Sequence, residues 1–250
     1  MALLGTLFAR ESNRTLVICF GGGNTFRAAA LMGAKVDVVE LISDVVRRAP
    51  EFHADALEHL RNEKHSIYIE DGRNFLLRTR NNYDVIIVDG TPPLYSAGSV
   101  NLYTQEFLRL AHSHLTPGGV MALWLPTLAF ESDYWHIISG MGGVFNHINT
   151  WSGNNLNGFL IFGSSDALEW PPGEIGRRIN ARMGNLPRGN VSEQRVRAGF
   201  RVDEASLRAY ASSFEPLTDD RPLVEFPLGG FWRREPLMES AAFLLKALKH

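Results

Sequence analysis

The first 90 residues contain two sets of residues of types that bind ligands. One is a run of three glycines, and the other is three carboxylates that each follow an apolar run. Gly21–Gly23 follow the apolar run "LVICF" and precede the helix-like run "TFRAAALM". Glycines leave the backbone open to a ligand, and N–H groups at the start of a helix attract polar or anionic groups. Glu40, Asp71 and Asp89 each follow a further apolar run. If those runs are parallel strands, all three acids border the crevice in which open α/β sheets bind ligands.

The glycine pattern differs from two common nucleotide-binding motifs. A dinucleotide fingerprint would place glycine at position 26, where the chain has Phe26, and a P-loop would continue with Gly-Lys-Ser/Thr. Glu40 lies near the end of the second expected strand, from which a carboxylate commonly accepts both hydroxyls of a ribose. These residues favour a nucleoside over NAD or ATP. The alternative is that Glu40 and Asp71 only cap helices or loops.

The elements that would position these residues alternate along the chain. Most of the expected strands are apolar on both faces, which is typical of a parallel sheet covered by helices on both sides. The strands are expected at 15–20, 36–41, 66–70, 83–89 and 120–125, the helices at 25–32, 43–62, 73–80 and 104–115, with Ser43 and Thr104 as N-caps. "TPGG" (116–119) should end the fourth helix and lead into the fifth strand. Residues 144–150 and 157–163 suit an antiparallel pair at the sheet edge.

This pattern predicts an α/β fold with a doubly wound, mostly parallel, seven-stranded sheet and helices on both faces. The periodicity weakens after Ser164. We therefore expect residues 1–165 to form the ligand-binding catalytic domain and residues 166–250 to form a C-terminal helical extension packed on it.

Composition and charge narrow the classes of function. The 250 residues are 45% hydrophobic and carry a formal net charge of −2 at pH 7, so we expect no nucleic-acid partner. The single cysteine, Cys19, offers no disulfide framework and no Cys-rich metal site. The apolar runs are too short for a membrane span, and the first residues lack the features of a signal peptide. We expect a cytoplasmic protein without a metal and without membrane contact by this chain, and we leave a homodimer open.

Four segments together resemble a known family. They are "LVICFGGGNTFRAAALMGAKVDVVEL", "IYIEDGRNFL", "YDVIIVDGTPP" and "NLYTQEFLRLAHSHLTPGGVMALW". They are similar to the catalytic domain of spermidine synthases, the polyamine aminopropyltransferases, over roughly residues 13 to 165. "PLTDDRPLVEF" (216–226) further resembles a late segment of bacterial membrane-fused spermidine synthase homologues. The resemblance implies a class I methyltransferase-like Rossmann fold.

The resemblance also implies a reaction and a set of site residues. The donor would be decarboxylated S-adenosylmethionine or S-adenosylmethionine, the acceptor a small-molecule amine, and the released product methylthioadenosine. Glu40 would hold the ribose, Asp71 and Gly72 would face the adenine, and Asp89 would face the amine. The full cofactor-binding set would be Gly21, Gly22, Gly23, Asn24, Glu40, Leu41, Asp71, Gly72, Asp89 and Gly90.

The chemistry of an amine acceptor explains why a carboxylate is needed. An alkylamine has a pKa of about 10, like lysine, so at neutral pH it is protonated and cannot attack carbon. Asp89 is the expected catalytic residue that orients the amine and removes its proton. The sulfonium supplies its own leaving group. The remaining task of the protein is to position the amine in line with the carbon–sulfur bond. Tyr95 and Tyr103 would line the substrate mouth as further catalytic residues, or else be half-buried core residues.

Three departures from the family pattern keep other functions open. Asn24 stands where the family has aspartate, and a neutral amide would tolerate the carboxylate of undecarboxylated S-adenosylmethionine, as in a methyltransferase or another alkyl transferase. Pro92 stands where the family has a second aspartate, which leaves open a catalytically degenerate nucleoside-binding domain. About a dozen residues precede the first expected strand, where the family has an N-terminal β-hairpin domain.

Overall fold

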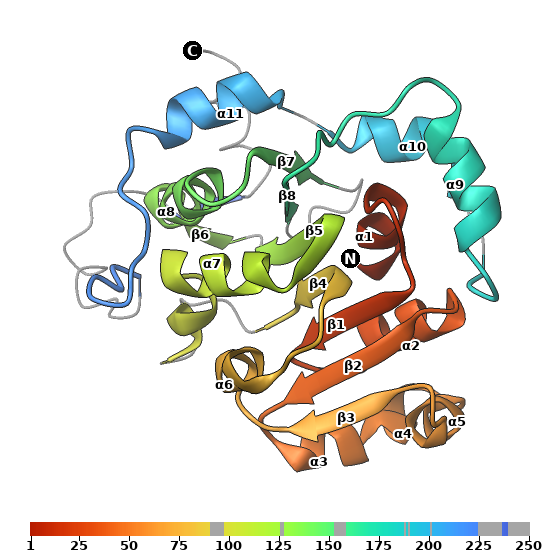
Figure 1. The fold of residues 1–250 in the computed structure, drawn as a ribbon. Helices are drawn as coiled ribbons and strands as arrows, with labels where there is room; N and C mark the ends of the chain where they lie inside the picture. The colour runs from red at the N-terminus through yellow and green to blue at the C-terminus, as the bar shows by residue number, and fades with distance from the viewer. Residues whose placement is uncertain are drawn as a thin grey trace. The chain divides into compact units, whose positions relative to one another are not determined.

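The structure is a computed structural model, and Figure 1 shows its fold. It describes residues 1–90, 98–125, 128–152, 159–187, 189, 191–200, 202–224 and 237–239. Seven strands form a mostly parallel sheet in the order β3-β2-β1-β4-β5-β8-β7, and β6 and β9 form a separate antiparallel pair. The predicted seven-stranded α/β fold is confirmed.

Two compact units make up the chain, and each draws on segments far apart in sequence. The first comprises Met1–Gly90, His114–Ala122 and Glu169–Arg197, and the second comprises Thr91–Ser113, Leu123–Leu168 and Ala198–His250. The division expected at residue 165 stays a prediction.

The first unit holds the strands that end beside the glycines and the acids. Its elements are α1 (Ala2–Phe8), β1 (Arg14–Ile18), α2 (Asn24–Leu31), β2 (Lys35–Glu40), α3 (Ser43–Arg47), α4 (Ala49–Phe52), α5 (Ala56–Arg61), β3 (Ser66–Ile69), α6 (Gly72–Arg78), β4 (Tyr83–Val88), most of β5 (Leu115–Leu125), α9 (Glu174–Arg182) and most of α10 (Glu193–Ala198). Strand β1 buries Leu16, Val17 and Ile18 and pairs in parallel with both β2 and β4. The core of this unit therefore lies on both faces of β1 and β4.

The strand order creates a switch point beside β1. The chain runs outward from β1 through β2 to β3, then returns through α6 to β4 on the other side of β1. Because β–helix–β crossovers are right-handed, this reversal puts α2 and α6 on opposite faces of the sheet. Ligands of such sheets bind where the order reverses, at the carboxyl ends of the strands. That place is the edge to which β1 and β4 carry the glycine loop and Asp89.

The second unit contains the remaining elements. They are the 3-10 helix η2 (Ser99–Leu102), α7 (Gln105–Ser113), β6 (Leu128–Phe130), α8 (Glu131–Gly142), β7 (His147–Trp151), β8 (Phe159–Ser164), α11 (Glu204–Ala211) and β9 (Leu237–Glu239). Strands β7 and β8 are antiparallel, and β7 ends the strand order, as the sequence predicted. Helix α8 carries a buried aromatic pair, Tyr134 and Trp135, into the core of this unit.

Several local expectations were wrong. The single helix expected over 43–62 is three short helices, because Pro50 can start α4 but cannot continue a preceding helix. Ser43 is the first residue of α3 and not its N-cap. The "TPGG" segment lies inside β5, where the Thr116 hydroxyl donates to Asp84 at 2.7 Å beside the start of β4. Thr104 does cap α7, since its hydroxyl oxygen accepts the Phe107 N–H at 3.4 Å.

Helix α1 was not expected, and two distant arginines hold its end. Arg178 donates to the carbonyls of Leu7 and Ala9, both at 2.8 Å, and Arg182 donates to those of Thr6 at 2.8 Å and Ala9 at 2.7 Å. The last carbonyls of a helix lack partners within it, so these cations on α9 complete the C-terminus of α1.

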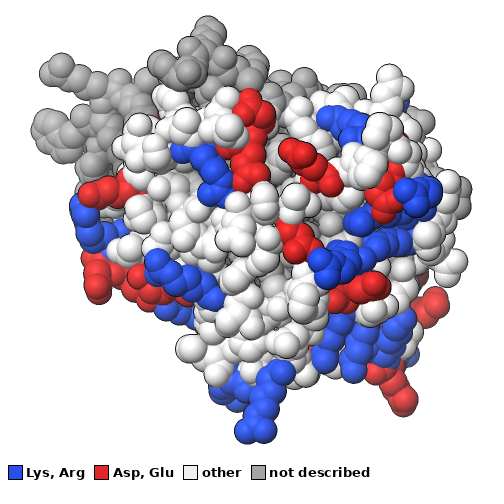
Figure 2. All heavy atoms as spheres, turned by 45° about the horizontal axis from the view of Figure 1, so that its top comes forward, with Lys and Arg blue, Asp and Glu red and all other residues white. Residues whose placement is uncertain are grey.

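Charges of both signs are interspersed over the face drawn in Figure 2. This arrangement agrees with the net charge of −2. Within the described part of the chain, none of the helices has the length and apolar character needed to span a membrane.

Candidate functional site

The loop after β1 has the open backbone that its glycines predicted. Gly21 and Gly23 have φ of 53° and 79°, in the left-handed region that favours glycine. At Gly23 a Cβ would also lie 2.8 Å from the Phe20 ring, so that position excludes a side chain on two grounds. Gly23 is the N-cap of α2 and leaves the first N–H groups of that helix without a side-chain cap. The loop can therefore present backbone N–H groups to a ligand.

Glu40 anchors this loop from the end of β2. Its Oε2 accepts the buried N–H of Phe20 at 2.8 Å, and its Oε1 accepts the N–H of Ile42 at 3.0 Å. The side chain is buried. Each carboxylate oxygen has a second acceptor site, so two hydroxyls can still bind. Glu40 therefore does cap the loop backbone, and its ribose-binding role stays a prediction that the geometry permits.

Asp71 and Gly72 lie at the start of α6. Asp71 is the N-cap, and its Oδ1 accepts the Asn74 N–H at 2.8 Å. A Cβ at Gly72 would overlap the side chain of Ile18 on β1, so only glycine lets α6 begin this close to the sheet. Asp71 therefore does cap a helix, and the contact of Asp71 and Gly72 with adenine stays a prediction.

Asp89 directly follows β4 and is held by two hydrogen bonds. Its N–H donates to the Ile18 carbonyl at 3.0 Å, which continues the β1–β4 ladder. Its Oδ2 accepts the hydroxyl of Thr25 at 2.6 Å. The side chain is half-buried, and Gly90 after it is buried. Asp89 therefore presents a carboxylate with one oxygen engaged at the carboxyl end of the central strands.

The thiol of Cys19 is affected by the charges of all three acids. Burial, followed by the charges of Glu40, Asp89 and Asp71, raises the pKa of its thiol to about 12. The thiol is therefore protonated and not a nucleophile at neutral pH. All three predicted acids thus act electrostatically on one side chain of the first unit. Cys19 falls in the strand expected at 15–20 and was not predicted at the site, although its position between β1 and the glycines was a signal for it.

Exposed apolar side chains flank Glu40. Leu41 and Ile42 are 66% and 56% exposed, and Ile69, which pairs with Glu40 across β2 and β3, is 52% exposed. Large apolar residues at such exposure beside acids suit the flat ring of a nucleobase. Leu41 was predicted as a binding residue. Ile42, which follows the strand expected at 36–41, and Ile69, near the end of the strand expected at 66–70, were not predicted.

The other predicted residues have different outcomes. Asn24 is the exposed first residue of α2. Tyr95 and Pro92 lie outside the described residues. Tyr103, in the second unit, is fully buried, which agrees with a core residue, and its role at a substrate mouth stays a prediction. Among the described residues, no group of three or more His, Cys, Asp or Glu is arranged to hold a metal ion.

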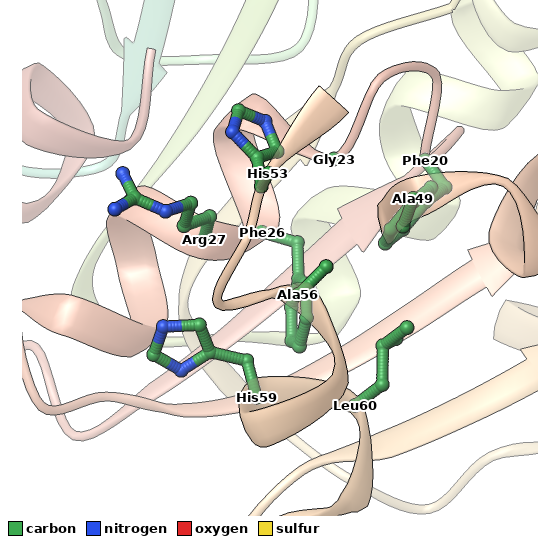
Figure 3. Close-up of a pocket in the computed structure, with 9 residues that line it drawn as sticks. All are labelled: Phe20, Gly23, Phe26, Arg27, Ala49, His53, Ala56, His59 and Leu60. Carbon is green, nitrogen blue, oxygen red and sulfur yellow. The ribbon is translucent and has the colours of Figure 1, made fainter. Parts of the chain in front are cut away.

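A small pocket lies behind the glycine loop (Figure 3). Its walls come from the loop, α2, α4, α5 and the residue after α4, and they are Phe20, Gly23, Phe26, Arg27, Ala49, His53, Ala56, His59 and Leu60. It has room for about one water molecule, about 10 Å³. None of the three acids lines it, and it is far too small for a nucleoside. The pocket is therefore a small packing gap between the glycine loop and the helices that support it, and it is not the predicted binding crevice.

Comparison with known proteins shows the family to which the chain belongs. The family described as "Spermine/spermidine synthase domain" matches residues 2–142. The chain is 28% identical to polyamine aminopropyltransferase 2 of Pseudomonas aeruginosa over 88% of the chain and 67% of that protein, and 30% identical to the polyamine aminopropyltransferase of Sulfolobus acidocaldarius over 74% of the chain and 64% of that protein. It spans only 50% of the length of the Aeropyrum pernix relative.

The fold is also that of a solved relative. The structure of spermidine synthase from Thermotoga maritima superposes with a TM-score of 0.65 at 16% identity, over 82% of this chain and 71% of that one. At that identity the likeness supports the fold, whereas the family match rests on the sequence. The glycine loop and all three acids fall inside the matched residues 2–142. The chain belongs to the spermine/spermidine synthase family.

Proposed function

We propose that this chain transfers the aminopropyl group of decarboxylated S-adenosylmethionine to a small amine and releases methylthioadenosine. The observation that carries the proposal is the position of Asp89, at the carboxyl end of β4 and hydrogen-bonded to α2, the helix that the glycine loop opens. The family membership and the names of the relatives in Pseudomonas aeruginosa and Sulfolobus acidocaldarius support the same reaction.

The proposed donor fits the residues at the carboxyl edge of the sheet. Glu40 retains acceptor sites for both ribose hydroxyls, and exposed Leu41 and Ile69 supply apolar surface for the base. The bare loop at Gly21–Gly23 lets the sulfonium part of the donor approach the backbone. Asp71 completes the polar boundary from the start of α6.

Asp89 then serves the acceptor. Its negative charge attracts the ammonium form of the amine, and its free oxygen accepts the proton that must leave before attack. The nitrogen lone pair forms a bond to the propyl carbon attached to sulfur, and the carbon–sulfur bond breaks with its electron pair on sulfur. The neutral thioether product is methylthioadenosine. The protein contributes orientation and charge, and the sulfonium contributes the leaving group.

Asn24 supports a second candidate function, transfer from undecarboxylated S-adenosylmethionine. It is the first residue of α2, where N–H groups lack intrahelical partners. A neutral amide beside such N–H groups would tolerate the carboxylate of S-adenosylmethionine, whereas an aspartate would repel it. A methyltransferase with this donor would release S-adenosylhomocysteine in place of methylthioadenosine.

The products distinguish these functions. The chain is incubated with putrescine and either decarboxylated S-adenosylmethionine or S-adenosylmethionine, and the products are identified by mass spectrometry. Methylthioadenosine with a lengthened amine supports aminopropyl transfer, and S-adenosylhomocysteine with a methylated amine supports the alternative. Methylthioadenosine binding by calorimetry without turnover on a broad amine panel would show a nucleoside-binding domain and contradict both.

A further inference from the structure

The hydrogen bond between Thr25 and Asp89 joins the second residue of α2 to the end of β4. The Thr25 hydroxyl donates to Asp89 Oδ2 at 2.6 Å, a short distance typical of a hydroxyl donating to a charged carboxylate. The Thr25 side chain is buried, whereas Asp89 is half-buried. The contact therefore ties the half-buried carboxylate of Asp89 to a buried side chain.

The two residues are fixed independently of each other. The backbone of Asp89 is held by its N–H bond to Ile18 on β1. Thr25 is held by the start of α2, where the next turn closes through Arg27 N–H to the Gly23 carbonyl at 2.9 Å. A β-branched side chain on a helix has few χ1 conformations. The hydroxyl thus has a defined direction and restricts the side-chain rotation of Asp89.

The bond also divides the work of the carboxylate between its oxygens. Oδ2 is engaged by the hydroxyl, and Oδ1 remains to accept from a substrate. The carboxylate lies against the N-terminus of α2, where the helix dipole favours negative charge. An acid that must orient an ammonium group by itself benefits from both effects, because a second rotamer would bind the amine in an unproductive direction.

We propose that Thr25 is a positioning residue for amine transfer, holding Asp89 in the one orientation in which Oδ1 receives the amine. This inference rests on the proposed function. Thr25 itself does not need to touch either substrate. Loss of its hydroxyl should lower the rate of the chemical step and leave nucleoside binding intact.

Three variants test the proposal. Thr25→Val keeps the shape and removes the donor, and Thr25→Ser keeps the donor and removes a methyl group. The matched control is Thr15→Val on β1, because Thr15 is also buried and its hydroxyl has no hydrogen-bond partner among the described residues. The measurements are kcat and the amine KM with decarboxylated S-adenosylmethionine, the Kd of methylthioadenosine by calorimetry, and thermal unfolding.

We expect Thr25→Val to lower kcat about 10- to 100-fold, the range for a lost hydrogen bond to a charged group. The amine KM and the methylthioadenosine Kd should change less than about threefold, since the charge and the loop remain. Thr25→Ser should recover activity to within about threefold of the unmodified chain, and Thr15→Val should match it.

Other results overturn the inference in separable ways. A Thr25→Val variant with unchanged kcat shows that the bond does not position Asp89. A Thr25→Val variant in which kcat, nucleoside affinity and thermal stability all fall together shows that Thr25 only stabilises the loop. An unmodified chain that turns over no amine with either donor refutes the proposed function and with it any positioning role.

Discussion

Replacing Glu40 with glutamine should affect folding and ligand binding together, because one carboxylate serves both. Its two oxygens accept N–H groups from Phe20 at 2.8 Å and from Ile42 at 3.0 Å. Glutamine has one acceptor oxygen, which will pair with the buried Phe20 N–H. Its NH₂ group then faces the N–H of Ile42, so two donors oppose each other.

The size of the effect on folding follows from these two bonds. Each hydrogen bond to a charged group contributes about 1.5–3 kcal/mol, and the single neutral bond that remains contributes about 0.5–1.5 kcal/mol. Because Ile42 is exposed and water can partly replace its lost partner, we expect a decrease of roughly 2–3 kcal/mol in the free energy of unfolding. In a chain of this size that corresponds to a Tm lower by about 5–10 °C.

The effect on binding is separate. In the Glu40→Gln variant, a nucleoside that donates both ribose hydroxyls to this residue no longer meets a charged acceptor. The binding of methylthioadenosine should therefore weaken by roughly 2–3 kcal/mol, or about 30- to 150-fold in Kd. Calorimetry at a temperature where the variant is folded measures this, and differential scanning calorimetry measures Tm. Glu63→Gln, at an exposed position on the same unit, is the matched control and should change neither value.

Each half of the reasoning can fail by itself. A Glu40→Gln variant that unfolds at the same temperature as the unmodified chain shows that the carboxylate does not anchor the loop. A folded variant with unchanged Kd for methylthioadenosine shows that Glu40 is not the ribose acceptor. In the second case its only role is the structural one.

Three further outcomes are expected. Asp89→Asn keeps the shape but removes the base, so turnover measured by mass spectrometry should fall about 10²- to 10⁴-fold while methylthioadenosine still binds; full turnover would exclude Asp89 as the base. Gly72→Ala should lower the free energy of unfolding by about 1–3 kcal/mol in denaturant titrations because its Cβ overlaps Ile18, whereas Gly22→Ala, whose Cβ has only an ordinary 3.6 Å contact, should leave stability nearly unchanged; equal stability of the two would contradict the packing argument. The hydrogen bond from Arg27 lowers the pKa of Asp55 to about 2, below its ordinary 3.8. The stability that this charged carboxylate adds is therefore present above about pH 4 and is lost as the pH falls toward 2. Between pH 4 and pH 2 the Asp55→Asn variant should lose less stability than the unmodified chain.

The strands and the edge at which the site forms could be predicted from the sequence. Each strand is a short β-branched run whose preference is local, and strand direction follows from the helices between the runs. Once the strands are parallel, residues that follow them must share one edge of the sheet. That is why Glu40, Asp71 and Asp89 could be grouped before any coordinates were known.

Two bonds inside the site could not be predicted, because they join residues far apart in sequence. Glu40 binds the N–H of Phe20, twenty positions earlier, and Asp89 binds the hydroxyl of Thr25, sixty-four positions earlier. Neither partner is marked by periodicity or by a motif. Only the parallel pairing of β1 with β2 and β4 brings these groups within hydrogen-bond distance.

Helix α1 shows the same limit for secondary structure. Its seven residues are too few for a stable isolated helix, so local preference alone gave no reason to expect it. In the folded chain, Arg178 and Arg182 complete its last carbonyls, and Gly5 allows it to pack against Val85 on β4. The sequence by itself determined the alternating strands and the edge that carries the acids. Tertiary structure decided which short segment became a helix and which hydroxyl holds Asp89, since both depend on contacts that form only when distant segments meet.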